Sequence, residues 1–348
     1  MKHVVVPAWI LLVMVLLCGG CSRAVPIRME FVLGTVCSVN LFEQGTAAEY
    51  DAVFARLRDV QAVMSANQDD TDLDAVNKNA GLQPVAVHRE LLDVLEEARR
   101  YAELSEGAFD PTIGPLVNLW GIGGENPRVP GEDEIREALS LVDWRDLVID
   151  REAGTAFLRR PGQALDLGAI AKGYAADQAA AILSVRGKNR RAIIDLGGNI
   201  LAIGERPKNE SWRIGVQNPL DERGEYLGVL RVKNKSVVTS GIYERYFEEN
   251  GERYHHILST ANGYPVQNGL LSVTIVADRS IDADALSTAA FALGLEKGRA
   301  LIEARPEAEA VFVSRDGSVA LSSGAEELFT LTGENYYLMP TSSISNTK

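Results

Sequence analysis

The feature that most restricts the fold is a run of short β-prone segments between Ala192 and Val276. Short turns or loops separate most of these segments. Such connections join antiparallel neighbours, because parallel strands need a long crossover. The predicted strands are Ala192–Asp195, Asn199–Ile203, Trp212–Val216, Tyr226–Val232, Ser236–Thr239, His255–Leu258 and Leu271–Val276. We therefore expect an α+β protein with antiparallel sheets and helices packed on one side.

Helical patterns flank this run on both sides. Apolar residues recur at intervals of three and four between Thr46 and Met64, and again between His88 and Leu104. The remaining predicted elements are a strand pair in Met29–Phe42 broken at Gly34, helices at Ala169–Val185 and Asp282–Leu293, one further helix, and strands at Ala310–Ser314 and Val319–Leu321. Because no Pro/Gly/Ser linker divides this region, residues 29–339 are predicted to form one domain, followed by a disordered polar tail at 340–348.

The N-terminus has the pattern of a secretory signal. A short charged start precedes an apolar run from Val4 to Leu17, and the sequence then reads Cys18-Gly-Gly-Cys21. Small residues directly before Cys21 resemble a bacterial lipobox, although Cys18 stands where leucine is usual. We expect a signal peptide at 1–20, lipid attachment at Cys21 and a tether at 21–28; ordinary signal cleavage beside an incidental cysteine is the alternative.

Composition narrows the class of protein further. After cleavage before Cys21 and its lipidation, only Cys37 keeps a free thiol, so the fold depends on its core and not on an internal disulfide. Hydrophobic residues make up 46% of the chain, which is typical of a globular protein. The net charge of −13 argues against nucleic acid or anionic lipid as the main partner. A phosphate-bearing ligand would therefore need a metal ion or local amides to receive it.

The stretch from Asp166 to Gln178 combines two glycines and a lysine at a helix start. It fits neither the Walker loop, because Lys172 precedes Gly173, nor the dinucleotide fingerprint. Its amides could still bind an anion at a helix N-terminus. A buried helix start, with the glycines allowing close packing, explains the same residues.

A second candidate site is the segment from Ser280 to Thr288. Asp284 and Thr288 are four residues apart, so on a helix they project from one face and could share a small ion. Oxygen ligands without nearby cysteine or histidine favour Mg²⁺, whose coordination is often completed by substrate phosphates. Asp282 is predicted to cap the helix. Acidic residues that merely stabilise the helix dipole are the alternative.

Two further segments hold candidate ligand contacts. His255 and His256 are adjacent on a predicted strand, so one should face inward and one outward. The inward histidine could serve as a base or could be a hydrogen-bonded core residue. The loop Gly107–Gly121 is rich in Pro, Gly and aromatic residues, and it could wall a flat heteroaromatic ligand or simply shape a turn. No G-x-S-x-G or H-E-x-x-H motif is present, which argues against an acyl-enzyme or a zinc hydrolase.

In order along the chain, these motifs resemble the ApbE family of FAD:protein FMN transferases, over nearly the whole mature chain. The resemblance rests on Leu33-Gly-Thr35, Gly107-Ala-Phe-Asp-Pro-Thr112, Leu119-Trp-Gly121, Leu165-Asp-Leu-Gly-Ala-Ile-Ala-Lys-Gly-Tyr174, Gly197-Gly-Asn199, Thr239-Ser-Gly241, His256-Ile-Leu258 and Asp284-Ala-Leu-Ser-Thr288. It implies a T-fold-like architecture and a Mg²⁺-dependent enzyme that splits FAD, releases AMP and attaches FMN to a threonine of a partner protein. The implied partner is a subunit of an Rnf-type or Na⁺-pumping redox complex. The implied location is the periplasmic side of a bacterial membrane, most often the inner membrane, through the lipid anchor.

The resemblance also assigns residues. Asp284, Thr288 and the carbonyl of Ala169 would hold Mg²⁺, and His256 would lie near the reacting phosphate as a candidate base. The implied FAD contacts are Leu33, Asn67, Ala108, Phe109, Asp110, Asp166, Lys172 and Ile257.

Two positions depart from the family pattern. Asn67 stands where many members have a tyrosine that can stack on the isoalloxazine, which predicts looser FAD retention. Ser259-Thr260 replaces the usual Asp-Pro, which could let water compete with the acceptor hydroxyl. Alternative functions are therefore an FAD pyrophosphatase that yields FMN and AMP, a non-catalytic flavin-binding lipoprotein, and a structural surface lipoprotein.

Overall fold

A nine-stranded sheet runs through the described part of the molecule. The computed structural model describes residues 27–184, 190–222 and 224–340, so the predicted signal peptide, Cys21 and the polar tail after Pro340 lie outside it. The strand order is β1 (Arg28–Val32), β2 (Thr35–Asn40), β6 (Ala192–Leu196), β7 (Asn199–Ile203), β10 (Lys235–Gly241), β13 (Leu270–Ala277), β14 (Ala308–Ser314), β15 (Ser318–Leu321) and β17 (Tyr337–Leu338). All neighbours in it are antiparallel except β15 and β17.

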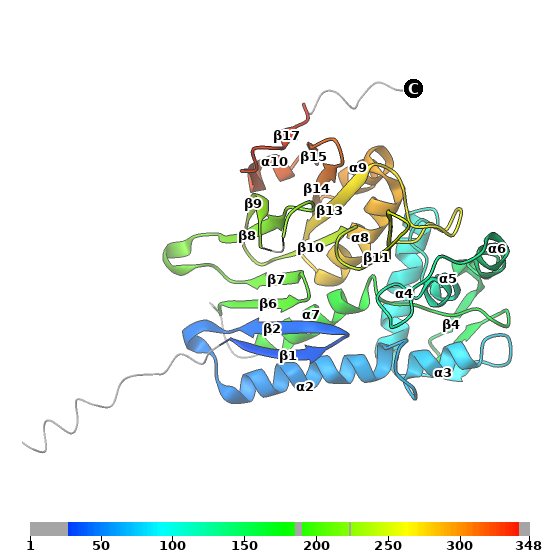
Figure 1. Cartoon of the computed structure of the whole chain (residues 1–348). Helices are drawn as coiled ribbons and strands as arrows, with labels where there is room; N and C mark the ends of the chain where they lie inside the picture. The colour runs from blue at the N-terminus through cyan, green and yellow to red at the C-terminus, as the bar shows by residue number, and fades with distance from the viewer. Residues whose placement is uncertain (1–26, 185–189, 223, 341–348) are drawn as a thin grey trace, which may run out of the picture.

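Helices cover one face of this sheet. The helices are α2 (Ala47–Met64), α7 (Ala171–Ser184), α8 (Ser280–Leu293) and α9 (Leu295–Glu303), with α4 (Arg89–Leu104) beside α8. Figure 1 shows α2 alongside β1 and α7. The α2 helix begins with a capping box at Thr46 and Glu49, which satisfies two N–H groups of its first turn.

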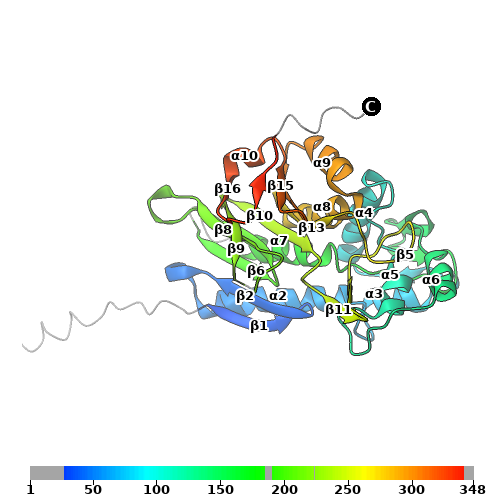
Figure 2. The ribbon, with the colours of Figure 1, turned by 45° about the horizontal axis from the view of Figure 1, so that its top comes forward.

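A small sheet covers the other face. It has the order β16 (Phe329–Leu331), β9 (Tyr226–Val232) and β8 (Trp212–Gln217), and Figure 2 shows these three strands grouped together. All of β13 is buried because successive residues point alternately into the cores on the two faces of the main sheet. Ile275 packs into the helix-side core and Val276 into the core under the small sheet.

The remaining elements surround this centre. They are α3 (Asp72–Lys78), α5 (Gly114–Trp120), α6 (Glu132–Leu139), α10 (Ala325–Leu328), a sheet of β3 (Val85–Ala86), β5 (Thr155–Leu158) and β4 (Leu147–Asp150), a hairpin of β11 (Tyr246–Glu249) and β12 (Glu252–His255), and the 3-10 turns η1 (Phe42–Gln44), η2 (Trp144–Asp146) and η3 (Pro207–Asn209). Trp120 links α5 to the loop after β12, because its indole N–H donates to the Gly263 carbonyl.

The α+β prediction is confirmed, and one strand prediction is wrong. The segment His255–Leu258 is not a strand: β12 ends at His255, and the chain then turns so that the His256 N–H donates to the Arg245 carbonyl. Within the described residues no helix is long and apolar enough to cross a membrane. Burial raises the pKa of the Cys37 thiol to about 12, so this group is an inert part of the core.

Candidate active site

The start of α7 and the first turns of α8 cross at very short range. A Cβ added at Gly173 would lie 2.4 Å from the Ser280 carbonyl oxygen, so only glycine allows this approach. The Gly173 N–H donates to Asp284 Oδ2 at 2.8 Å. The two predicted segments, more than a hundred residues apart, therefore meet at one point.

This contact changes the hydrogen bonding of Ala169. In a continuous helix the Gly173 N–H would donate to the carbonyl four residues earlier, which is that of Ala169. Here it donates to Asp284, and no group in the described ranges donates to the Ala169 carbonyl. The carbonyl oxygen is thus available for a ligand at the same helix crossing.

Asp284 and Thr288 supply side-chain oxygens at this crossing. Asp284 is 4% exposed, and Lys172 Nζ lies 3.7 Å from its Oδ1. The Thr288 hydroxyl, one turn later, lies 3.1 Å from Ser240 Oγ at the end of β10. The structure therefore brings both predicted side-chain ligands to one helix face.

The oxygen set fits a hard divalent cation. It comprises one carboxylate, one hydroxyl and one backbone carbonyl that lacks a hydrogen-bond donor. The described residues contain no group of three or more His, Cys, Asp or Glu side chains that could hold a metal. An ion at this point would therefore depend on these few protein oxygens together with those of a bound substrate.

Asp166 and Lys172 make hydrogen bonds within the segment before α7, and the Asp166 backbone joins it to a neighbouring loop. Asp166 Oδ1 accepts the Gly168 N–H at 2.8 Å, and its own N–H donates to the Pro111 carbonyl. Lys172 Nζ donates to the Gly168 carbonyl at 2.8 Å. The loop that contains Ala108, Phe109 and Asp110 therefore lies next to the helix start.

Within that loop, two of the predicted ligand-contact residues have structural contacts. Phe109 packs in the core against the Tyr101 ring. Asp110 is buried, which raises its pKa, and its carboxylate accepts the Thr112 N–H and hydroxyl and the Trp144 N–H. Ala108 is half-buried. The Asp110 carboxylate thus stabilises the loop, and the FAD contacts of Ala108, Phe109 and Asp110 stay predictions.

One ring nitrogen of His256 makes a hydrogen bond to the backbone, and the other can act as an acceptor. Its Nδ1 lies 3.2 Å from the Arg245 carbonyl, which can only accept, so Nδ1 carries the proton. Desolvation, followed by the charge of Arg245 and more weakly that of Lys172, lowers the pKa of the imidazole below its usual value near 6.5. At neutral pH the ring is therefore neutral, with Nε2 able to accept a proton.

The other predicted contact residues lie on separate elements. Ile257 is buried next to His256. Leu33 lies at the tip of the β1–β2 hairpin with a φ of 56°, and its N–H donates to the Gln61 side chain. Asn67 is exposed on the turn after α2, and no contact in the described residues joins it to the α7–α8 crossing.

The prediction that Asp282 caps α8 is wrong. The helix begins two residues earlier, at Ser280, and Asp177 of α7 accepts the N–H groups of Ser280 and Ile281. Asp282 Oδ1 instead accepts the Tyr101 hydroxyl at 2.6 Å. Sequence reasoning missed Asp177, because nothing local links it to residues a hundred positions later.

A comparison with known protein families covers both helices of this crossing. The model described as the ApbE family matches residues 33–312.

The chain belongs to the ApbE family.

A relative from Treponema pallidum (strain Nichols), named FAD:protein FMN transferase, is 41% identical over 325 residues, which cover 88% of this chain and 90% of the relative. One of the same name from Klebsiella pneumoniae (strain 342) is 37% identical and covers 88% of this chain and 95% of its own length. The crystal structure of the ApbE protein from Thermotoga maritima superposes with a TM-score of 0.79 at 32% identity, covering 87% of this chain and 98% of that one. The predicted family is thus confirmed.

Proposed function

We propose that this ApbE-family chain is an FAD:protein FMN transferase, which cleaves FAD and joins FMN to a protein acceptor while releasing AMP. The observation that carries the proposal is the match to two relatives of that name, at 41% and 37% identity over 90% or more of their length.

The proposed reaction is a displacement at the FMN-side phosphorus of FAD. The acceptor hydroxyl oxygen forms the new P–O bond, the bond from that phosphorus to the bridging oxygen breaks, and AMP leaves with the bridging oxygen. His256 Nε2 accepts the hydroxyl proton, and the proton ends on AMP. Lys172 places positive charge beside the pyrophosphate. The acceptor hydroxyl is proposed to be that of a threonine.

We further propose that Asp284, Thr288 and the Ala169 carbonyl hold Mg²⁺. When bound, this ion would neutralise charge on the pyrophosphate oxygens and fix their orientation. The support is the combination of a buried carboxylate, a hydroxyl on the same helix face and a carbonyl released from the helical hydrogen-bond pattern.

The acceptor and the location follow from the same proposal. A subunit of an Rnf-type or Na⁺-pumping redox complex is the proposed acceptor, on the periplasmic side of a bacterial membrane and more often the inner one. Lipid attachment at Cys21, six residues before the first described residue, would keep the enzyme beside a membrane-bound acceptor.

A second candidate activity is hydrolysis of FAD to FMN and AMP. Two observations favour it. Asn67 is exposed and offers no ring to the flavin. The turn after Leu258 differs from the family pattern: Ser259 Oγ accepts the Ala261 N–H, and Thr260 Oγ1 donates to the Gly107 carbonyl, which ties this turn to the loop containing Ala108.

Incubation of the full-length protein with FAD, Mg²⁺ and a redox-complex subunit tests the proposal. We expect covalent flavin on an acceptor threonine, located by mass spectrometry, together with an equal amount of AMP. Chelation by EDTA should stop both. AMP without adduct would show that the hydrolase is the correct activity, and no AMP with any divalent metal would reject the enzyme proposal.

A further inference from the structure

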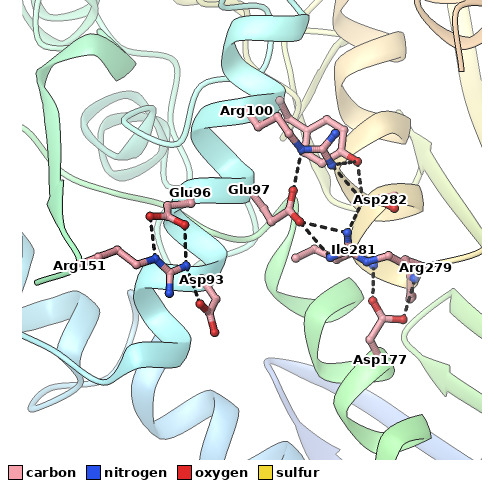
Figure 3. Close-up of polar contacts among 11 residues, drawn as sticks. Asp93, Glu96, Glu97, Arg100, Arg151, Asp177, Arg279, Ile281 and Asp282 are labelled. Atoms are coloured by element: carbon pink, nitrogen blue, oxygen red, sulfur yellow. Dashed lines mark hydrogen bonds and ion pairs between the residues drawn. The ribbon is translucent and has the colours of Figure 1, made fainter. Parts of the chain in front are cut away.

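The first turn of α8 is capped by another helix. The two oxygens of Asp177, on α7, accept the Ser280 N–H at 2.8 Å and the Ile281 N–H at 3.0 Å (Figure 3). The first N–H groups of a helix have no partner within it, and the N-cap residue Arg279 makes no side-chain cap here. Asp177 therefore does for α8 what a local cap would normally do.

The same turn is held from the other side by α4. Glu97 Oε1 accepts two N–H groups of Arg279, each at 3.0 Å, and its Oε2 accepts the Arg100 Nε–H at 2.7 Å (Figure 3). Asp282 Oδ1 accepts from the Tyr101 hydroxyl and from Arg100. Side chains of α4 thus contact the start of α8 at Arg279 and Asp282, in addition to the contacts from Asp177.

The position of Asp177 on α7 gives these contacts a consequence for the site. Asp177 lies four residues after Gly173, so both are on one face of the helix. One turn of α7 contacts Asp284 through the Gly173 N–H, and the next turn contacts the start of α8 through Asp177. Two contacts a turn apart fix both the translation and the rotation of α8 relative to α7.

We propose that Asp177 and Glu97 are positioning residues for the metal site, holding the first turn of α8 so that Asp284 and Thr288 face the Ala169 carbonyl. The inference rests on the proposed function. Neither residue contacts the site oxygens: Asp177 acts through the backbone N–H groups of Ser280 and Ile281, and Glu97 acts through the side chain of Arg279.

The test measures Mn²⁺ binding to the full-length protein by electron paramagnetic resonance, without FAD. Asp177→Asn keeps one acceptor but turns an amide N–H toward the second backbone N–H, and Glu97→Gln removes the charge that pairs with Arg279. Glu96→Gln is the matched control: this neighbour pairs with Arg151 on the other side of α4 (Figure 3). Binding that persists in Asp284→Asn is subtracted as non-specific.

We expect Asp177→Asn to weaken Mn²⁺ affinity by about 10-fold or more, which is typical for residues that orient metal ligands. Glu97→Gln should weaken it less, and Glu96→Gln not at all. Unchanged affinity in Asp177→Asn and Glu97→Gln, with lower melting temperatures in EDTA, would show that the two residues have a structural role only. That result would overturn this inference but not the proposed function. If Asp177→Asn does not fold, Glu97→Gln decides. A wild-type chain that binds no Mn²⁺ above the Asp284→Asn level would overturn the metal proposal and this inference together.

Discussion

At the scale of single residues, the most informative group is the imidazole of His256. Its Nδ1–H is committed to the Arg245 carbonyl, which leaves Nε2 as the proton acceptor. His256→Gln keeps a polar side chain but no base. We expect single-turnover flavin transfer at pH 7 to slow by about 10²- to 10⁴-fold, the usual contribution of a general base. The dissociation constant for FAD should change little; a rate within a few-fold of wild type would exclude this base.

The pH dependence of the wild-type enzyme follows from the direction of the same pKa shift. Burial lowers the pKa of His256 below 6.5, so the proposed base is lost only as the pH falls through that lower value. The transfer rate should therefore be flat from pH 8 to pH 6.5, with its acidic decline below 6.5. A decline centred above pH 6.5 would assign it to a different group.

Asn67 allows a gain-of-function test. Its side chain is exposed on the turn after α2, so Asn67→Tyr adds a ring without disturbing the core. If this turn borders the flavin, stacking should tighten FAD binding by roughly 1 kcal/mol, or about fivefold. Fluorescence titration with FAD measures the affinity. Equal affinity for the two proteins would place the flavin elsewhere.

At the scale of secondary-structure elements, the α7–α8 crossing depends on one glycine. The methyl group of Gly173→Ala would lie 2.4 Å from the Ser280 carbonyl oxygen and 2.6 Å from Ile281 Cα. Relief of this clash should cost about 1–3 kcal/mol of unfolding free energy and move Asp284 away from α7. Urea unfolding measures the first effect and Mn²⁺ binding the second. Gly131→Ala, at an exposed position where φ is −68° and the added Cβ would meet nothing closer than 3.4 Å, controls for general effects of glycine replacement. Wild-type stability in Gly173→Ala would contradict the close approach.

The sequence predicted individual helices and strands better than it predicted the tertiary contacts between them. Periodicity located α2 and α4, and the four-residue spacing put Asp284 and Thr288 on one face of α8. The crossing itself depends on contacts between residues more than a hundred positions apart, which local patterns do not encode. The same limit explains the error at Asp282: a first-turn acid usually caps its own helix, but here Asp177 already does so.

At the scale of the whole molecule, a buried ion pair joins α2 to Arg190, two residues before β6. Glu49 Oε1 and Arg190 Nη1 are 2.7 Å apart with both side chains largely buried, and the hydrogen bond from Arg190 lowers the pKa of Glu49 to about 2. Glu49→Gln leaves the Arg190 charge without its partner, which should cost about 3–5 kcal/mol of unfolding free energy at pH 7.

The pH dependence of that loss has a definite sign. A carboxyl group with a depressed folded-state pKa contributes stability above its unfolded pKa of about 4.5, and this is lost as the pH falls toward 2. The difference in unfolding free energy between wild type and Glu49→Gln should therefore be smaller at pH 3 than at pH 7. An equal difference at both pH values would show that Glu49 acts through packing and not through its charge.

The three-layer architecture, with helices on one face of the main sheet and a small sheet on the other, was only partly predictable. The antiparallel run from Ala192 to Val276 and the helices on one face agree with the pattern. The sequence pattern did not predict the small sheet of β8, β9 and β16 on the other face. The reason is that β16 comes from the far end of the chain, and its three residues show no periodic pattern. The uniform burial of β13 reflects the cover on both faces of the main sheet.

The most direct test of the central claim compares wild type with Asp284→Asn in the presence of FAD, Mg²⁺ and the acceptor. Asparagine keeps an oxygen for the Gly173 N–H but removes the charge. We predict that wild type releases AMP and labels the acceptor in equal amounts. The variant should lose both by about 10²-fold or more, with an unchanged melting temperature in EDTA. An Asp284→Asn protein that releases AMP at the wild-type rate would contradict the assignment of the active site to the α7–α8 crossing.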